Sequence, residues 1–353
     1  MPATSLARLF PCLALVCVLS GVGCSTRQGP GACLEPGGCA DAAPADAAGG
    51  DGALDGGSDA VDAAADAFRV DRPDGSIWVD PGALSGDDYL FVLDRIDLGA
   101  ADPLGDATIV PGFDIDGFVS DGADPKGCRK ADHVSPPPDS LTGVDNELGP
   151  LLAGNEASFG VRANLATTIA SGELLVLFRI RGVDSFVNDE LVIVEALFGA
   201  LPVGVSAPLL DGAGRYQPGQ TFDIDSRSYL PDRVTPITRM RAAIVEGRLE
   251  GGPVDMPIEF PFRGVPIRVL VEQLQLRFDI GIDGLARGVM GGALNVEDTV
   301  STLSVTDLPE STIRLILEGS ADLWPDSRFR CQFLSVALVF DGRPALPGVV
   351  VGP

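Results

Sequence analysis

Residues 268–280 read RVLVEQLQLRFDI, and this stretch decides the fold class. From Leu274 onward apolar and polar residues alternate, which on a β-strand places one kind of side chain on each face. A strand with one dry face and one wet face is typical of an antiparallel sheet that covers a hydrophobic core on one side. We therefore expect a mainly β protein.

Similar stretches flank this one on both sides. Apolar runs rich in β-branched residues recur at short intervals, and Gly, Asp, Asn and Pro separate them. This pattern indicates an antiparallel β-sandwich or a closed barrel, and we expect the sandwich, of the jelly-roll or lectin-like kind. The predicted strands are 89–98, 173–180, 190–198, 221–225, 240–249, 257–262, 266–280, 286–294, 312–318 and 329–340.

One or two short helices complete the expected fold. In residues 157–171 the side chains of Phe159, Leu165 and Ile169 fall roughly on one helical face. Gly172 follows at the position of a C-capping glycine, which places the end of this helix. A second short helix is expected to begin near Glu297.

The first residues have the pattern of an export signal. Arg8 precedes an apolar run at 9–19, which is too short to span a bilayer, and small residues follow. Gly21-Val22-Gly23-Cys24 resembles a lipobox, although Gly21 stands where Leu is usual. We expect residues 1–23 to be a lipoprotein signal peptide and Cys24 to carry lipid. An ordinary secretory signal cut at the same small residues is the alternative.

The residues after Cys24 have the composition of a linker. Residues 24–68 consist mostly of Ala, Gly, Asp and Pro and lack apolar periodicity, so they cannot bury enough surface to offset the entropy of ordering. We expect a lipidated, disordered acidic tether there, and a single folded domain at 69–353. By resemblance to Gram-negative sorting rules, Ser25 directs the protein to the outer membrane of the cell envelope.

Composition limits the partners. The chain has 353 residues, of which 45% are hydrophobic, enough for a sizeable core. Its formal net charge of −25 repels phosphate backbones, so we expect no nucleic-acid partner. The expected contact with a membrane is through the N-terminal lipid, and a protein or glycan partner stays unidentified.

The cysteines suit an oxidising compartment. After removal of the signal and lipidation of Cys24, four cysteines remain, and four cysteines allow three pairings. Cys33 and Cys39 are close in sequence with two glycines between them, so we expect them to pair. That leaves Cys128 to pair with Cys331.

The segment at 112–149 is the candidate site. It reads GFDIDGFVSDGADPKGCRKADHVSPPPDSLTGVDNELG and is long, acidic and without a regular pattern. Such segments are uncommon inside domains unless something organises them, and Ca²⁺ with its 6–8 oxygen ligands is one organiser. On a strand, the two carboxylates of the first aspartate pair would project from one face about 7 Å apart. The expected ligands are Asp114, Asp116, Asp121, Asp145 and Asn146.

A second interpretation needs no metal. The spacing does not match an EF-hand, because Phe118 and Val119 stand where that loop needs a ligand and a glycine. Asp-Gly pairs form turns, and Lys126, Arg129 and Lys130 would neutralise the carboxylates. The sequence leaves both interpretations open.

At this point the chain resembles a family of uncharacterised Gram-negative bacterial lipoproteins. The resemblance rests on Asp114-Ile115-Asp116-Gly117, on Val144-Asp145-Asn146-Glu147-Leu148-Gly149, and on Cys331 followed by an apolar strand. It implies a location in the envelope and this order of elements, and it implies no activity.

The sequence lacks residues that several classes of enzyme need. His133 is the only histidine, and it lies in a charged, Pro-rich loop where a solvated side chain is the expected state. Trp78 and Trp324 could stack on sugars, although burial is the commoner role of such residues. We expect a non-catalytic binding or structural module in the envelope; the alternative is a carboxylate-dependent hydrolase of extracellular glycan.

Overall fold

The computed structural model describes residues 84–352 except 101–105, 263–264 and 307. These residues belong to a compact unit that spans Ser76–Pro353. The expected signal peptide and tether, together with Cys24, Cys33, Cys39 and Trp78, lie outside the described residues. Among the helices that the structure describes, none is long and apolar enough to cross a membrane.

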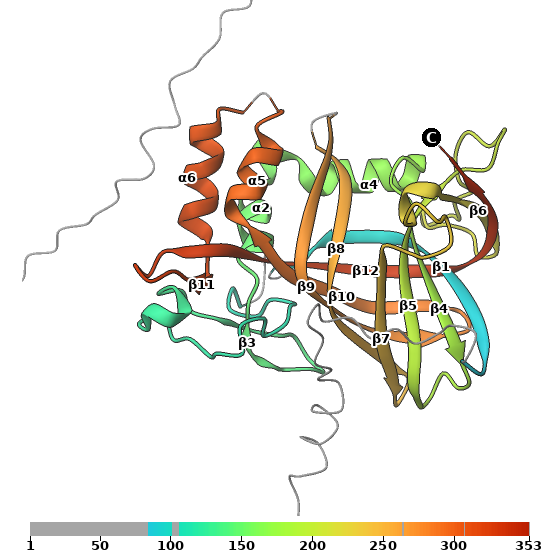
Figure 1. Cartoon of the computed structure of the whole chain (residues 1–353), viewed down its shortest axis with the longest axis horizontal. Coiled ribbons are helices and arrows are strands. Elements are labelled where there is room, and N and C mark those ends of the chain that lie inside the picture. Colours follow the sequence, from blue (N-terminus) through green and yellow to red (C-terminus); the bar gives the residue numbers. More distant parts are fainter. Residues whose placement is uncertain (1–83, 101–105, 263–264, 307, 353) are drawn as a thin grey trace, which may run out of the picture. The chain divides into compact units, whose positions relative to one another are not determined.

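The centre of the unit is a sheet that closes on itself (Figure 1). Eight strands form the ring, and each is antiparallel to both neighbours. The closure depends on β1, which pairs with β4 on one side and with β12 on the other. Around the ring the strands are β1 (Asp87–Leu98), β4 (Val176–Val183), β5 (Asp189–Ala200), β7 (Thr238–Val245), β8 (Arg248–Phe262), β9 (Val265–Gly281), β10 (Gly284–Asn295) and β12 (Cys331–Val351).

Two shorter strands join this ring from outside. The strand β6 (Gln220–Asp225) runs parallel to the end of β12 and also pairs with the end of β5. The strand β11 (Leu323–Pro325) pairs with the beginning of β12.

The mainly β expectation is confirmed, since strands (49%) outweigh helices (18%). The sandwich expectation is corrected: the main sheet closes into a barrel. Alternation along one strand shows only that one face is dry, a condition that both architectures meet. What separates them is the pairing of the first strand with the last, such as Leu90 with Ala345, a contact that no local pattern reveals.

Aromatic side chains fill the middle of the barrel. Phe178 of β4, Phe278 of β9 and Phe340 of β12 are almost fully buried and contact one another. Their ring centroids lie 5.5–6.2 Å apart, two of the three pairs edge to face, an arrangement that favours aromatic packing. Because side chains alternate along a strand, the neighbours of these residues point out of the barrel.

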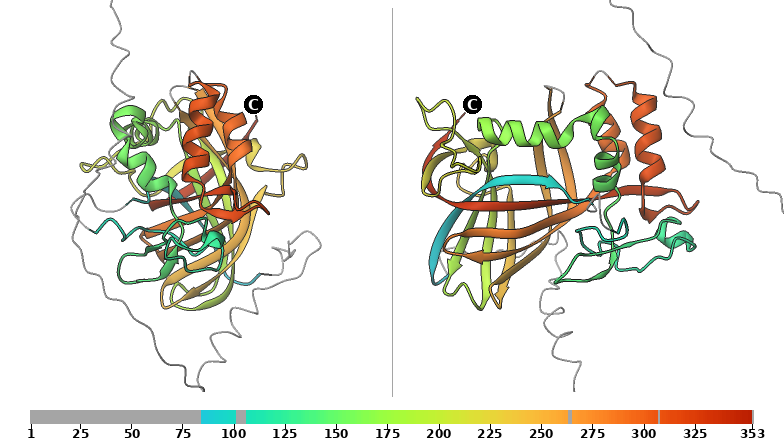
Figure 2. Two further views of the ribbon diagram at one scale, coloured as in Figure 1. Left: turned by 90° about the vertical axis from the view of Figure 1, so that its left-hand side faces the viewer. Right: turned by 180° about the vertical axis from the view of Figure 1, so that it is seen from behind.

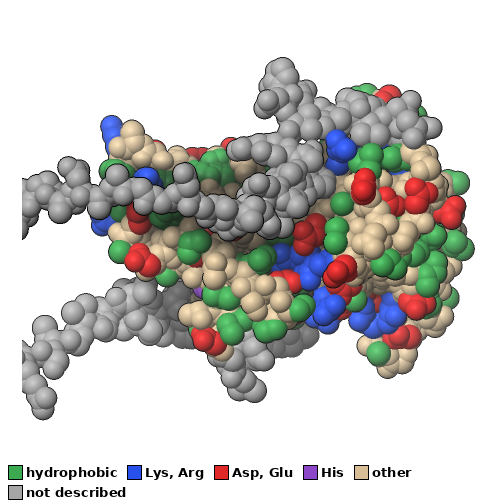
Figure 3. All heavy atoms as spheres, turned by 90° about the horizontal axis from the view of Figure 1, so that it is seen from below, with side chains coloured by type: hydrophobic (Ala, Val, Ile, Leu, Met, Phe, Trp, Pro, Cys, Tyr) green, Lys and Arg blue, Asp and Glu red, His purple; other side chains and the backbone are tan. Residues whose placement is uncertain are grey.

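Charged residues occupy part of that outer face. Glu195 of β5 is fully buried, and in the sheet it stands opposite Arg179 of β4 and Arg239 of β7. Both arginines pair with its carboxylate, at 2.5 and 3.2 Å, and Arg181 approaches it at 3.6 Å. On the face seen in Figure 3, basic side chains likewise stand beside acidic ones.

The helices gather on one side of the barrel, where Figures 1 and 2 show them above the sheet. They are α2 (Leu148–Gly154), α3 (Glu156–Phe159), α4 (Val161–Ser171), α5 (Val296–Leu303) and α6 (Glu310–Ser320). The predicted helix at 157–171 is present but divided, because Gly160 adopts a left-handed conformation with φ of 61°. Gly172 caps its end, as predicted.

Two predicted strands are wrong. Residues 312–318 form most of α6: Ile313 and Leu317 are buried, while Leu315 is 73% exposed. A strand would have put all three on one face, whereas a helix turns Leu315 away. The predicted strand 240–249 is two strands, because Glu246 and Gly247 both have positive φ and form the tight turn between β7 and β8.

The acidic segment packs on the outside of the barrel. Phe113 and Ile115 lie in a small apolar cluster with Val289 of β10 and Ala337 of β12. Trp324 packs edge to face on Phe333 at the border of this cluster, with ring centroids 4.8 Å apart. Before α2 begins at Leu148, the helices and strands of the segment are η2 (Pro125–Gly127), β2 (His133–Val134) and β3 (Thr142–Val144). The position of the segment is therefore set by contacts with the barrel.

Candidate functional site

Three aspartates meet at one end of the acidic segment. One carboxylate oxygen from each of Asp114, Asp116 and Asp145 lies within 4.8 Å of the other two, close enough for a shared metal ion. Asp145 is buried, Asp116 is half-buried and Asp114 is exposed, so the group opens toward solvent on one side. We call these three residues the Asp triad.

The route by which the triad forms differs from the expected one. Asp114 and Asp116 are not on a strand; the backbone bends at 115–117. Each accepts a hydrogen bond from a backbone N–H further along, Asp114 from Gly117 at 2.7 Å and Asp116 from Phe118 at 2.8 Å. Such local bonds are typical of turns, and here they bring the two carboxylates together.

Asp145 comes to the triad from the far end of the segment. Its N–H donates to Phe113 O at 2.8 Å, and its carboxylate accepts from the N–H groups of Ile115 at 2.7 Å and Asp116 at 3.3 Å. The two ends of the segment are thus joined at this residue, as the sequence predicts.

Burial and neighbouring carboxylates disfavour the ionised form of all three aspartates at once. Burial raises the pKa of Asp145 to about 8, and the nearby charges of Asp116, Asp322 and Asp132 reinforce the shift against the bond from Ile115. Burial also raises the pKa of Asp116, and that of Asp132 to about 6. Protonation of Asp145 or binding of a divalent cation would each relieve this cost, so the triad could hold a metal ion.

One of the expected cationic partners, Lys130, pairs outside the triad. Lys130 lies 3.7 Å from Glu147, which is outside the triad. His133 lies 3.9 Å from the same carboxylate and its side chain is only 17% exposed, so the expectation of a solvated histidine is wrong. Burial lowers the pKa of His133, and Glu147 partly opposes this effect.

Two of the five expected ligands are engaged in other hydrogen bonds. Asp121 is not one of the three grouped aspartates, and its carboxylate accepts from Ala123 N at 2.9 Å. Asn146 is fully buried and all of its amide is engaged. Its Nδ2 donates to Gly99 O and Pro111 O, and its Oδ1 accepts from Gly149 N at 3.1 Å and Ala337 N at 3.0 Å.

Residues next to Asn146 extend this network into the barrel wall. The N–H of Glu147 donates to Ser335 Oγ at 2.8 Å, and that hydroxyl donates to Asp322. Asp322 also accepts from Ser335 N at 2.8 Å. Burial raises the pKa of Asp322 to about 7, although the two bonds from Ser335 oppose the shift. No local pattern in the sequence marks Asp322, which is far from the segment along the chain.

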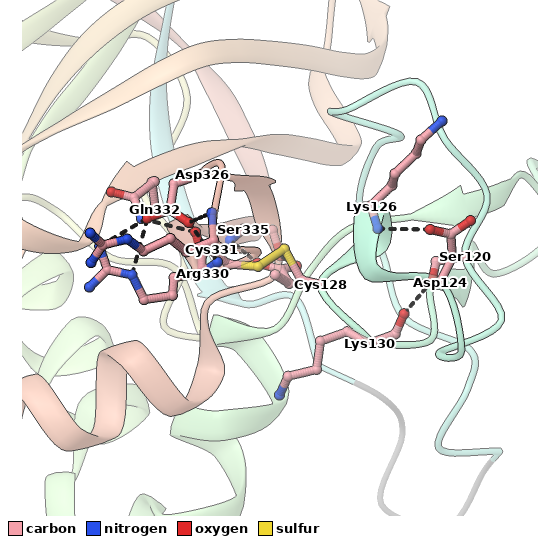
Figure 4. Close-up of a disulfide and its surroundings, with 12 residues drawn as sticks. Ser120, Asp124, Lys126, Cys128, Lys130, Asp326, Arg330, Cys331, Gln332 and Ser335 are labelled. Carbon is pink, nitrogen blue, oxygen red and sulfur yellow. Dashed lines mark hydrogen bonds and ion pairs between the residues drawn. A yellow bond between two sulfur atoms is a disulfide. The ribbon is translucent and has the colours of Figure 1, made fainter.

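The disulfide is present where the sequence predicts it. Cys128 in the middle of the acidic segment is joined to Cys331 at the start of β12, with Cα atoms 6.0 Å apart (Figure 4). It ties the outer part of the segment, which includes the turn at Asp124 and Lys126, to the barrel.

Arg277 anchors the segment on its other side. This side chain of β9 is 5% exposed and lies 2.8 Å from Asp139, which also pairs with Arg248 at 2.6 Å. Its guanidinium stands over the ring of Phe113, 4.8 Å from the centroid. The segment that carries the triad is thus held by a covalent bond, a buried ion pair and an apolar cluster.

A separate feature lies between the barrel and the helices. A cavity of ≈ 190 Å³ is bounded by the inward faces of β1, β8, β9, β10 and β12 and by α2, α4, α5 and α6. Its lining is almost entirely aliphatic, with Ile96, Met256, Met290, Leu303 and Ile316 among the contributors. No motif marks it, because its residues come from elements throughout the chain.

The cavity is partly open to solvent. Two methionines line it, and their flexible side chains adapt to irregular contents. The helices and the sheet therefore line a space large enough for an apolar guest.

The chain matches no protein-family model, no curated protein and no solved structure.

Proposed function

We propose that this chain is a lipid-anchored protein of the bacterial cell envelope whose barrel is a non-catalytic binding or structural module, with Ca²⁺ bound at the Asp triad. The observation that carries the calcium proposal is the approach of three carboxylates, from two ends of one segment, to within 4.8 Å. Hard oxygen ligands and irregular geometry suit Ca²⁺, and water molecules would complete the shell on the open side.

The proposed role of the ion is structural. Asp114 and Asp116 belong to the beginning of the acidic segment and Asp145 to its end, so an ion bound to all three would close the segment as a loop. Such an ion binds the folded form only, and it stabilises that form by about 2.7 kcal/mol when its concentration is a hundredfold above Kd. A surface loop held in this way is suited to presenting a binding face.

Thermal unfolding tests the calcium site. The melting temperature of the soluble folded unit should rise with millimolar Ca²⁺ and fall with chelator, and Asp116→Asn should remove the response. Asp121→Asn is the matched control, because it changes an aspartate of the same segment outside the triad and should keep the response. Equal melting curves with Ca²⁺ and with chelator, together with no metal in the purified protein, would rule the site out.

The location in the envelope is tested separately. The proposal rests on the lipobox-like residues before Cys24 and on the resemblance to Gram-negative lipoproteins. Cys24→Ser prevents attachment of lipid, so the mature protein should leave the membrane fraction and the detergent phase. If the variant fractionates with outer membranes as fully as the parent protein, the anchor is a different one.

The hydrolase alternative has a specific observation in its favour. Asp145, with a pKa raised to about 8, could donate a proton while a neighbouring carboxylate stays ionised. The triad oxygens, however, lie within 4.8 Å, slightly closer than the roughly 5–5.5 Å of retaining glycosidases. Release of reducing sugar from envelope polysaccharide that is lost in Asp145→Asn would favour the enzyme over the module.

A further inference from the structure

We propose that the cavity between the barrel and the helices binds the end of an aliphatic chain that carries no charge. Its volume of ≈ 190 Å³ exceeds that of an engineered apolar cavity of about 150 Å³ that binds benzene. This inference does not depend on the calcium site, which lies on the outer face of the barrel.

The lining decides the class of ligand. Strand residues such as Val271, Met290 and Leu294 form the floor, and helix residues such as Leu151 and Leu303 form the roof. The aliphatic groups of the lining provide dispersion and hydrophobic contacts but very few hydrogen bonds. A sugar, a nucleotide or a peptide backbone would lose its hydrogen bonds to water in this cavity, whereas an alkyl chain has none to lose.

The charges near the cavity limit the class of ligand further. Among the described residues that line the cavity, the only charged side chain is Glu259, and Arg227 holds its carboxylate at 2.9 Å. Arg227 also pairs with Asp225 at 2.7 Å, so this guanidinium is already shared by two carboxylates. A carboxylate at the end of the ligand would meet net negative charge here and across the whole chain, which carries −25. An alcohol or an ester end avoids this repulsion.

Titration calorimetry of the full-length chain tests the proposal with decanol, decanoate and dioctanoylglycerol. Decanol should give a saturable heat of one molecule per chain, and decanoate should bind about tenfold more weakly or less. Binding of dioctanoylglycerol in addition would mean that the site accepts a chain that belongs to a lipid. If decanol binds and dioctanoylglycerol does not, the site accepts free aliphatic chains but not the chains of a lipid. Absence of saturable binding by both neutral ligands would overturn the proposal.

Filling the cavity supplies the structural control. Leu303→Trp on α5 and Leu151→Trp on α2 each place a large ring in the space from a half-buried position, and each should weaken decanol binding by about tenfold or more. Leu315→Trp on α6 makes the same change at a side chain that is 73% exposed, and should bind as the parent does. Circular dichroism shows which variants fold. If the two folded cavity variants bind decanol as tightly as Leu315→Trp, the ligand binds elsewhere and the proposal is wrong.

Discussion

Asn146 and Ala337 are 191 residues apart in sequence, and the backbone N–H of Ala337 donates to Asn146 Oδ1 at 3.0 Å. Through this one side chain the end of the acidic segment is joined to the middle of β12. The amide is fully buried and bonds four backbone groups, two as donor and two as acceptor. The Asp145-Asn146 pair thus combines two roles, because the first residue belongs to the Asp triad and the second holds the triad on the barrel.

Asn146→Ala should be strongly destabilising. It removes the bonds to four backbone groups, three of them buried, and each buried loss costs about 1–3 kcal/mol before relaxation or water entry compensates. We expect a decrease in the free energy of unfolding on the order of 3–5 kcal/mol in urea titrations. Asn155→Ala is the control, because its exposed side chain makes one bond to Leu151 O and its loss should change stability by less than about 1 kcal/mol. Similar losses for the two variants would contradict the role assigned to Asn146.

Asp139→Asn should cost more than an ordinary loss of a surface ion pair. The carboxylate lies between Arg248 and Arg277, and Arg277 is 5% exposed, so the change leaves buried positive charge without a partner. Breaking a buried pair in this way typically costs about 3–5 kcal/mol. Glu250→Gln removes a carboxylate that is 66% exposed and 3.7 Å from Arg248, and should cost less than about 1 kcal/mol. Equal effects in chemical denaturation would show that Arg277 is adequately solvated.

Asp322 should make the protein less stable as the pH rises. Its pKa in the folded chain is about 7, above the roughly 4 of an unfolded aspartate, so the fold favours the protonated form. The contribution to stability is complete below about pH 4 and disappears as the pH rises through about 7, with a size on the order of 4 kcal/mol.

The variant Asp322→Asn isolates this contribution. Measured in chelator, its free energy of unfolding should depend less on pH between about 4 and 7 than that of the parent chain. Some dependence should remain, because the pKa values of Asp145 and Asp132 are raised in the same direction. Parallel curves for parent and variant would show that Asp322 is ionised in the fold throughout this range.

Removal of the disulfide should destabilise the whole unit. Cys128 and Cys331 are 203 residues apart, and the chain-entropy model assigns a cross-link over such a loop about 5 kcal/mol. The double variant Cys128→Ser, Cys331→Ser should therefore unfold at much lower urea. Limited proteolysis should also cut it first within the acidic segment, whose covalent tie to β12 is gone. A variant that resists urea and protease as the parent does would show that Arg277 and Asn146 hold the segment without the bond.

Much of the fold follows from local patterns in the sequence. Alternation in residues 274–280 predicts β9, and Gly172 predicts the end of α4. The pattern fails where two structures share a periodicity: Ile313 and Leu317 are on one face of a strand and also of a helix. It fails again for α2, whose sequence LGPLLAG contains two glycines and a proline, so only contact with the barrel explains its helical form.

Local sequence also predicts part of the candidate site. The sequence predicts that Asp114, Asp116 and Asp145 share a partner, because the segment has many aspartates and no apolar pattern. The fully engaged amide of Asn146 and the buried Asp322 could not be predicted, since both depend on which part of β12 lies against the segment. The cavity depends on still more elements and has no local signal at all.

The pairing of β1 with β12 also sets an order of events during biosynthesis. A chain that emerges with its N-terminus first exposes Asp87–Leu98 long before Cys331–Val351 exists to pair with it. Until then one edge of β1 has no partner, and such edges are where chains join one another by mistake. The strand β12 brings Cys331 as well, so ring closure and the covalent link to Cys128 become possible together. The barrel consequently cannot close until β12 has been made.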